Sequence, residues 1–119
     1  DFGDMVRSAT AASKEAERDL SRVGSRIGMF AALARGYLAE AAFLLPAEID
    51  ELVFSGRLIT LTIAIRFLTD YLSGDVYFRT HRPGQNLDRC RTQLQMVRSM
   101  EAQAEAMEKI VREVGGSRA

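Results

Sequence analysis

Apolar side chains recur at three- and four-residue steps along most of the chain, which is the spacing of an amphipathic helix. In residues 29–45 the recurring positions include Phe30, Leu33, Tyr37, Leu38 and Ala41. No hairpin dipeptide separates two alternating runs, and β-branched residues fall mainly inside segments with helical spacing. The pattern therefore predicts an all-α protein with a long helix over residues 29–45.

Glycine, proline and capping residues divide the first half of the chain. Residues 1–10 are predicted to form a short helix capped by the Asp1 side chain, and the charged residues 13–19 a solvated loop. Pro46 lacks an amide donor and suits the first turn of a further helix. We expect that helix to span residues 47–54 and to end at the Ser55-Gly56 pair.

Residues 57–73 are apolar on nearly every side, which predicts a central helix buried on most faces. Gly74 is expected to end it, and residues 75–85 to form a loop. Asn86 is the predicted N-cap of a last helix that reaches about Val114 and measures roughly 40 Å. Its apolar stripe consists of Leu87, Leu94, Val97, Met100, Ala104, Met107 and Val111. The expected fold is one domain over residues 1–119, a small helical array of about five helices.

Composition narrows the class of protein. The chain has 119 residues, 47% of them hydrophobic and 27% charged, as in a soluble globular domain. Its 16 acidic residues balance 16 basic ones, which does not favour nucleic acid as a partner. Polar residues such as Thr62 and Arg66 interrupt the apolar runs, so we expect no membrane span. Cys90 is the single cysteine, which excludes an intrachain disulfide and favours the cytoplasm.

The first residues of the chain do not form a recognisable catalytic motif. The chain opens on Asp1 and its first methionine is Met5, so we expect a piece of a longer protein. Asp1-Phe2-Gly3 matches the magnesium-binding triplet of protein kinases, but no catalytic loop, glycine-rich loop or Walker lysine accompanies it. The favoured interpretation is a helix cap followed by an Asp4 to Arg7 pair.

The residue types that most often react or bind metal are sparse. His81 is the only histidine and has no second zinc-type ligand at a helical or turn spacing. Cys90 lies between Arg89 and Arg91, but adjacent residues of a helix point in different directions. We expect Cys90 to be a semi-buried packing residue, and predict no catalytic or metal-binding residue in this chain.

Arg66 is the informative polar residue, because it interrupts an apolar helix and is followed one turn later by Asp70. A buried guanidinium is costly unless it is paired. One interpretation is an internal ion pair between Arg66 and Asp70. The other is that Arg66 faces a cleft and donates to a polyhydroxylated ligand, with Tyr77 and Phe78 in the following loop as stacking residues. Periodicity alone leaves both open.

Two strings of residues resemble a known family. Residues 66–78 read RFLTDYLSGDVYF and residues 86–93 read NLDRCRTQ. Together they resemble the C-terminal region of N-acetylhexosamine 1-kinases, which belong to the aminoglycoside phosphotransferase family. The opening DFGDMVR resembles a segment that follows the metal-binding aspartate in the same proteins. The likeness spans nearly the whole chain.

The resemblance implies the C-terminal helical subdomain of a protein-kinase-like phosphotransferase fold. The parent enzyme would transfer the γ-phosphoryl group of ATP to a sugar hydroxyl, the anomeric one, with Mg²⁺ and an upstream aspartate. Arg66 and Tyr77 match the family residues that hydrogen-bond the N-acetylhexosamine. This chain alone would lack the nucleotide and catalytic-base elements and be inactive. Its partners would be the sugar and the N-terminal part of the same kinase.

Two other functions are open. Some relatives carry a mucin-desulfating sulfatase label, but Cys90 is followed by Arg-Thr-Gln and lacks the Cys/Ser-x-Pro-x-Arg signature of sulfatases. The chain is alternatively a non-catalytic helical interaction module, in which an exposed apolar face binds a partner or a second copy.

Overall fold

The computed structural model describes residues 2–41 and 44–116, and within these the chain is helical, with a single β-bridge between Ala11 and Ser25. The prediction of an all-α fold is confirmed for the described residues. The α-helices are α1 (Phe2–Ala9), α2 (Ile27–Glu40), α3 (Pro46–Asp50), α4 (Leu52–Leu72), α5 (Gln85–Ala102) and α6 (Ala104–Gly116), and a 3-10 turn, η1, spans Leu20–Arg22.

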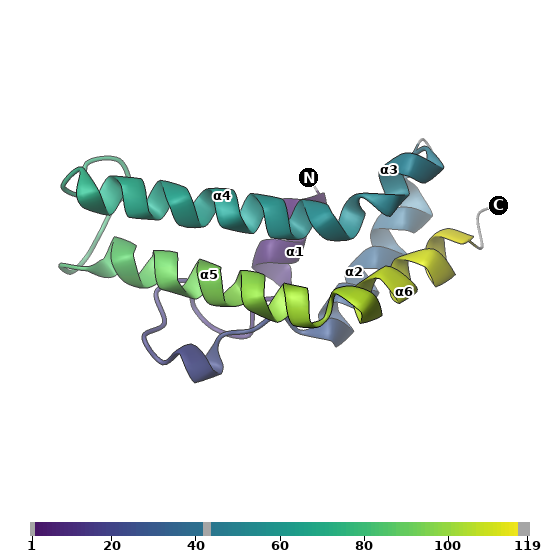
Figure 1. Ribbon diagram of the computed structural model, residues 1–119, viewed down its shortest axis with the longest axis horizontal. Helices are drawn as coiled ribbons and strands as arrows, with labels where there is room; N and C mark the ends of the chain where they lie inside the picture. The colour runs from purple at the N-terminus through teal and green to yellow at the C-terminus, as the bar shows by residue number, and fades with distance from the viewer. Residues whose placement is uncertain (1, 42–43, 117–119) are drawn as a thin grey trace.

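Helices α4 and α5 form a long antiparallel hairpin that sets the shape of the molecule (Figure 1). The loop between them lies at one end of the long axis, and α2, α3 and α6 gather at the other (Figure 1). The resulting body measures 51 × 27 × 18 Å. The α4–α5 loop is therefore far from the largest part of the core.

Two groups of buried side chains hold this arrangement together. The larger group joins the helices at the α2, α3 and α6 end, and its members are Phe2, Val6, Val23, Phe30, Ala34, Leu38, Leu52, Val53, Met96, Met100, Met107 and Val111. The smaller group consists of Ala64, Phe67 and Cys90, with Ile63 and Phe78 packed against it. It fixes the loop end of the hairpin, since burial of apolar area is the main stabilising term.

The predicted break at Ser55-Gly56 is wrong, because α4 continues through both residues. Close packing of α1 against α4 explains why Gly56 lies inside α4. A Cβ atom on Gly56 would lie 3.0 Å from Cγ1 of Val6, and one on Gly3 would lie 2.6 Å from the carbonyl oxygen of Ser55. Gly56 is thus required for close packing of the two helices. From the local sequence alone, a glycine with this role cannot be distinguished from a glycine that ends a helix.

The predicted burial of residues 57–73 on most faces is also wrong. One side of α4 is buried against α1 and α5, while the opposite side exposes a row of large apolar residues. We call this row the α4 stripe, and it consists of Phe54, Leu58, Leu61, Ile65, Leu68 and Leu72. Their alternating four- and three-residue spacing is that of a coiled-coil seam. Hydropathy alone does not show which apolar face of a helix has a neighbour.

The length of α4 changes the expectation about membranes. Its 21 residues have a window of mean hydropathy 1.6, so by length and composition α4 is able to cross a bilayer, although 33% of that window is buried against the protein. The sequence interpretation expected no span because polar residues such as Thr62 and Arg66 interrupt the apolar runs, but the average over the whole helix remains apolar. Core helices of soluble proteins have the same length and composition.

The last predicted helix is in fact two. The chain leaves helical geometry at Gln103, whose side-chain Nε2 donates to the Ser25 carbonyl at 2.7 Å, and α6 then packs on α2. Asn86 is not the N-cap, because α5 begins at Gln85 after Gly84, whose φ is 75°. Within the predicted stripe Met100, Met107 and Val111 are buried, whereas Leu94 is exposed.

Several local predictions agree with the structure. Pro46 opens α3, although this helix ends at Asp50 rather than at residue 54. The Asp4 to Arg7 pair is present, with 3.0 Å between Oδ1 and Nε. Gly74 follows the end of α4 with a left-handed φ of 97°. The predicted helix over residues 29–45 is α2, which starts at Ile27 and ends at Glu40. The proposed Asp1 cap lies outside the described residues.

Replacing Gly3 with alanine tests the α1–α4 contact. Since the new methyl group meets a backbone carbonyl, we expect Gly3→Ala to lower the free energy of unfolding by about 1–3 kcal/mol. Gly36→Ala is the matched control, because nothing lies within 4 Å of its Cβ position inside α2. It should raise stability by about 0.5–1 kcal/mol. Urea unfolding followed by circular dichroism measures both; equal effects would contradict the contact.

Candidate functional site

A hollow of about 370 Å³ opens at the loop end of the α4–α5 hairpin. Its walls are the last turns of α4 and the loop that follows them. We call it the Arg66 hollow, and it is lined by Arg66, Thr69, Asp70, Ser73, Val76, Tyr77 and Phe78. Its volume falls within the range of small-molecule sites. Both residues that the family resemblance singled out, Arg66 and Tyr77, line it.

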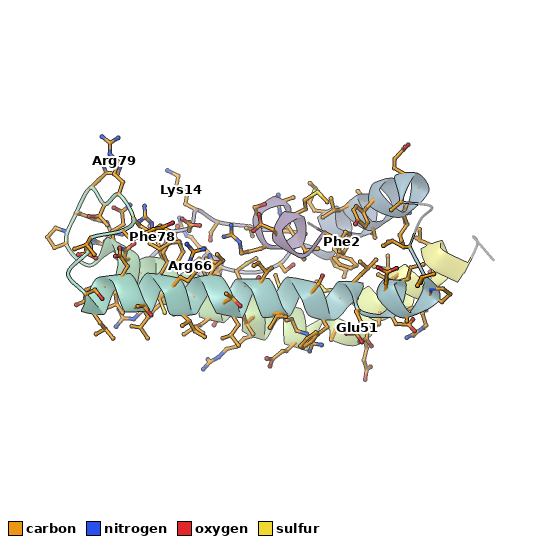
Figure 2. The ribbon with its side chains drawn as sticks, turned by 90° about the horizontal axis from the view of Figure 1, so that it is seen from above. Phe2, Lys14, Glu51, Arg66, Phe78 and Arg79 are labelled. Carbon is orange, nitrogen blue, oxygen red and sulfur yellow. The ribbon has the colours of Figure 1, made fainter. Side chains whose placement is uncertain are left out.

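Arg66 is exposed, which corrects the expectation of a guanidinium inside the helical core. Its guanidinium carbon lies 5.5 Å from the ring centroids of both Tyr77 and Phe78. Figure 2 shows Arg66 rising from α4 on the side where Phe78 lies. Contacts of this kind with an aromatic face are attractive because the ring carries negative charge on its faces. The cation is therefore held beside the two rings while its donors stay accessible to a ligand.

The Asp70 carboxylate organises the loop that carries these rings. Its Oδ1 accepts the backbone N–H groups of Val76 at 3.0 Å and Tyr77 at 2.7 Å, and its Oδ2 accepts that of Phe78 at 3.0 Å. Asp70 is 5% exposed. One buried side chain thus sets the path of three consecutive loop residues, two of which bear the aromatic walls of the hollow.

A second buried residue extends this network to α5. The Nδ2 group of Asn86 donates to Asp70 Oδ2 at 2.7 Å and to Asp75 Oδ1 at 3.0 Å, and Asn86 is fully buried. Its own Oδ1 accepts from Arg89 at 2.8 Å. Asp75 has a φ of 60°, a left-handed conformation that aspartate tolerates better than most residues. The loop is consequently fixed to both helices of the hairpin.

The ion pair proposed between Arg66 and Asp70 is wrong. The ion pairs found among the described residues do not join these two side chains. The Asp70 oxygens are occupied by the loop amides and Asn86, and Arg66 faces the rings instead. One turn of helix places the residues close, but the loop supplies better donors to the carboxylate.

Hydrogen bonding decides the charge state of Asp70. Burial by itself raises the pKa of this carboxyl, because it disfavours the ionised form. The bonds from Phe78, Tyr77, Val76 and Asn86 act in the opposite direction and outweigh burial, so the pKa lies below its ordinary value. Asp70 is therefore ionised at neutral pH, and its oxygens are engaged by the loop amides and Asn86.

The remaining groups of the hollow suit a polyhydroxylated ligand. Arg66 offers a fork of donors, Tyr77 a ring face and a phenol, and Thr69 and Ser73 hydroxyl groups. The Thr69 hydroxyl donates to the Ile65 carbonyl at 2.8 Å, which leaves its lone pairs to accept. A sugar ring presents both an apolar face and hydroxyl groups, so these walls match it on both counts.

The reactive residue types lie away from this hollow. Cys90 is buried in the smaller core group, and burial raises the pKa of its thiol despite the charge of Arg91. His81 is exposed in the α4–α5 loop, where its backbone N–H donates to Gln85. Across residues 2–41 and 44–116, groups of three or more His, Cys, Asp or Glu placed to hold a metal ion are absent.

Sequence reasoning identified most of the walls and missed what holds them. Arg66, Tyr77 and Phe78 drew attention as polar or aromatic positions. The roles of Asp70 and Asn86 did not, because Asp70 was assigned to Arg66 and Asn86 to a helix cap. The only available signal was a left-handed Gly74 directly after the helix, which turns the chain back over the preceding carboxylate.

Asp70→Asn should loosen the loop, because an amide nitrogen would face backbone N–H donors. Because folding lowers the pKa of Asp70, the stability of the chain depends on pH. The ionised carboxylate contributes stability that is fully present above its unfolded pKa of about 3.9 and is lost as the pH falls through the lower folded pKa. Between pH 5 and pH 3 the wild-type chain should therefore lose more stability than Asp70→Asn.

Urea unfolding at several pH values measures this difference, and other carboxylates contribute equally to both chains. Amide hydrogen exchange at Val76, Tyr77 and Phe78 should accelerate selectively in the variant. Parallel pH curves with unchanged exchange at these three amides would show that Asp70 does not hold the loop.

A scan of the sequence against protein-family models finds no match. The function is therefore inferred from the geometry of the Arg66 hollow together with the resemblance of residues 66–78.

Proposed function

We propose that this chain is the sugar-binding, C-terminal helical subdomain of an ATP-dependent phosphotransferase that acts on an N-acetylhexosamine or a similar sugar. The supporting observation is that Arg66 and Tyr77, separated by a helix end and a turn, line one hollow of about 370 Å³. These are the two residues that the resemblance to N-acetylhexosamine 1-kinases assigns to the sugar. In this proposal the subdomain belongs to a protein-kinase-like fold in the cytoplasm.

Each wall of the hollow has a role in the proposed complex. The Arg66 fork donates to sugar oxygens, and a guanidinium that also contacts two rings loses little freedom on binding. Tyr77 stacks on the apolar face of the sugar or donates through its phenol. Asp70 contributes by holding Tyr77 and Phe78 in place before the ligand arrives, which reduces the entropy lost on binding.

The chemical step requires groups outside this chain. Transfer of the γ-phosphoryl group of ATP to the anomeric hydroxyl would use Mg²⁺, nucleotide-binding residues and a catalytic aspartate in the N-terminal part of the proposed kinase. Phosphoryl transfer depends on positioning and charge stabilisation, so the part of the protein that fixes the acceptor sugar has a direct effect on rate. This chain by itself is proposed to bind the sugar without phosphorylating it.

The α4 stripe is the proposed docking surface for that N-terminal part. It lies on the helix that also carries Arg66 and Thr69 of the hollow, and its Ile65 and Leu68 are their neighbours in sequence. A catalytic part that covers the stripe would stand next to the sugar. The regular four- and three-residue spacing of the stripe fits an α-helix as the covering element.

Sugar binding is tested by two-dimensional NMR of the chain titrated with N-acetylglucosamine, N-acetylgalactosamine and glucose. We expect saturable shifts of the Tyr77, Phe78 and Thr69 amides with an N-acetylhexosamine. Arg66→Ala should weaken the affinity by about tenfold or more, the worth of one charge-assisted hydrogen bond. Tyr77→Phe should have a smaller effect because the ring remains.

Arg91→Ala is the matched control for these variants, since its side chain is 59% exposed on α5 and outside the hollow. It should bind sugar as the wild-type chain does. Absence of sugar-dependent shifts in the hollow, or equal affinities for all four chains, would refute the sugar site.

A second candidate function is a non-catalytic helical interaction module, and the exposed α4 stripe favours it. The stripe is unusual for an isolated soluble domain, since exposed apolar rows of this length usually mark an interface. In this alternative the stripe pairs with a partner helix or a second copy of the chain. An alternating spacing that reads the same in both directions allows antiparallel pairing of two copies.

Ile65→Glu separates the two candidates, because Ile65 is 55% exposed in the middle of the stripe. If the chain is a self-associating module, sedimentation equilibrium should show a dimer that becomes a monomer in this variant. Thr62→Glu is the control, since Thr62 is exposed on α4 but outside the stripe. A wild-type chain that is monomeric at high concentration and binds sugar would remove support for the module.

A further inference from the structure

A second hollow of about 350 Å³ lies near the Arg66 hollow and shares the Phe78 ring with it. Helices α1, α4 and α5 and both neighbouring loops contribute to it. We call it the Arg89 hollow, and it is lined by Arg7, Glu15, Ile63, Phe67, Phe78, Arg79 and Arg89. The residues that line it include three arginines and one glutamate, so their formal charges sum to 3 − 1 = +2.

Two of the three cations are largely buried and share one carboxylate. The side chains of Arg7 and Arg89 are 17% and 15% exposed. Glu15 is 43% exposed and lies 3.3 Å from Nη1 of Arg7 and 3.7 Å from Nε of Arg89. Both distances exceed those of a strong charge-assisted hydrogen bond, about 2.7–2.9 Å. Arg7 has a further partner in Asp4, which lies outside the hollow.

The neutral partners of these arginines leave donors unused. Arg7 also donates to Gln93, and Arg89 to Asn86 and to the Arg79 carbonyl, in each case through Nη1. Among the residues that the structure describes, neither Nη2 group has a protein acceptor. Neither Nη2 group is among the buried side-chain atoms that lack a partner, so both reach solvent, where an anion can accept hydrogen bonds from them.

Arg79 supplies the third cation at the rim. It is exposed and extends outward from the α4–α5 loop (Figure 2). It takes part in neither an ion pair nor a side-chain hydrogen bond with the described residues. Its position in the loop is nevertheless fixed, because its carbonyl accepts from Arg89. A rim cation of this kind attracts anions toward the two buried ones.

We propose that the Arg89 hollow binds the phosphate group of a small phosphomonoester. Planar guanidinium forks match phosphate oxygens, and the excess of arginine over carboxylate in the lining attracts a phosphomonoester, which carries about two negative charges at pH 7. The apolar walls formed by Ile63, Phe67 and Phe78 are available to the organic part of the ligand. This proposal does not depend on sugar binding in the Arg66 hollow.

Titration of the chain with inorganic phosphate, followed by two-dimensional NMR at constant ionic strength, tests the site. We expect saturable, one-site shifts at the Arg7, Arg79 and Arg89 amides and arginine side-chain Nε–H signals, with chloride producing none. Arg79→Ala should weaken phosphate binding by about three- to fivefold, the effect of one exposed charge.

Glu15→Gln gives a change of opposite sign, which a purely structural role of Glu15 would not produce. Removing the competing carboxylate raises the lining charge to +3 and should strengthen phosphate binding by about threefold or more. Arg91→Ala, outside both hollows, is the control for loss of a neighbouring positive charge and should leave the affinity unchanged.

Three results would overturn the proposal: no saturable response to phosphate, an equal response to chloride, or the same affinity in Glu15→Gln, Arg79→Ala and Arg91→Ala. A thermal-shift series with the same variants gives a second readout. Phosphate should raise the melting temperature of the wild-type chain more than that of Arg79→Ala.

Discussion

The buried carboxylate of Asp70 is the interaction on which the loop end of the molecule depends. It accepts three consecutive backbone N–H groups and the Asn86 amide, and so joins α4, the loop and α5 at one point. Without this carboxylate, the backbone N–H groups of Val76, Tyr77 and Phe78 would lose their hydrogen-bond acceptor. Both hollows use a wall, Phe78, whose backbone position this carboxylate sets.

Much of the helical content could be predicted from the sequence because it depends on local chemistry. The helical spacing around Phe30 and Leu38, the proline that opens α3 and the glycine after α4 all act within a few residues. What could not be predicted depends on partners far along the chain. Gly56 lies inside a helix because Val6 packs against it, and the break at Gln103 is stabilised by the Ser25 carbonyl.

The candidate site shows the same division. An arginine in an apolar helix and an aromatic pair after a turn were visible in the sequence, and the family resemblance connected Arg66 with Tyr77. Their exposure was not visible, since an apolar helix can be buried or can have one uncovered face. The partner of Asp70 was assigned by helical spacing, which ignores the loop that folds back over it. The cluster of Arg7, Glu15 and Arg89 joins residues from three parts of the chain and has no local signal.

Phe78 lines both hollows and packs against two other aromatic rings. Its ring contacts that of Phe67, with 4.7 Å between centroids, and that of Tyr77, with 4.9 Å between centroids. Because the Asp70 carboxylate fixes the backbone at this residue, the side-chain torsions are the freedom that remains to it. Occupants of the two hollows would therefore meet the same side chain, whose backbone the Asp70 carboxylate holds in place.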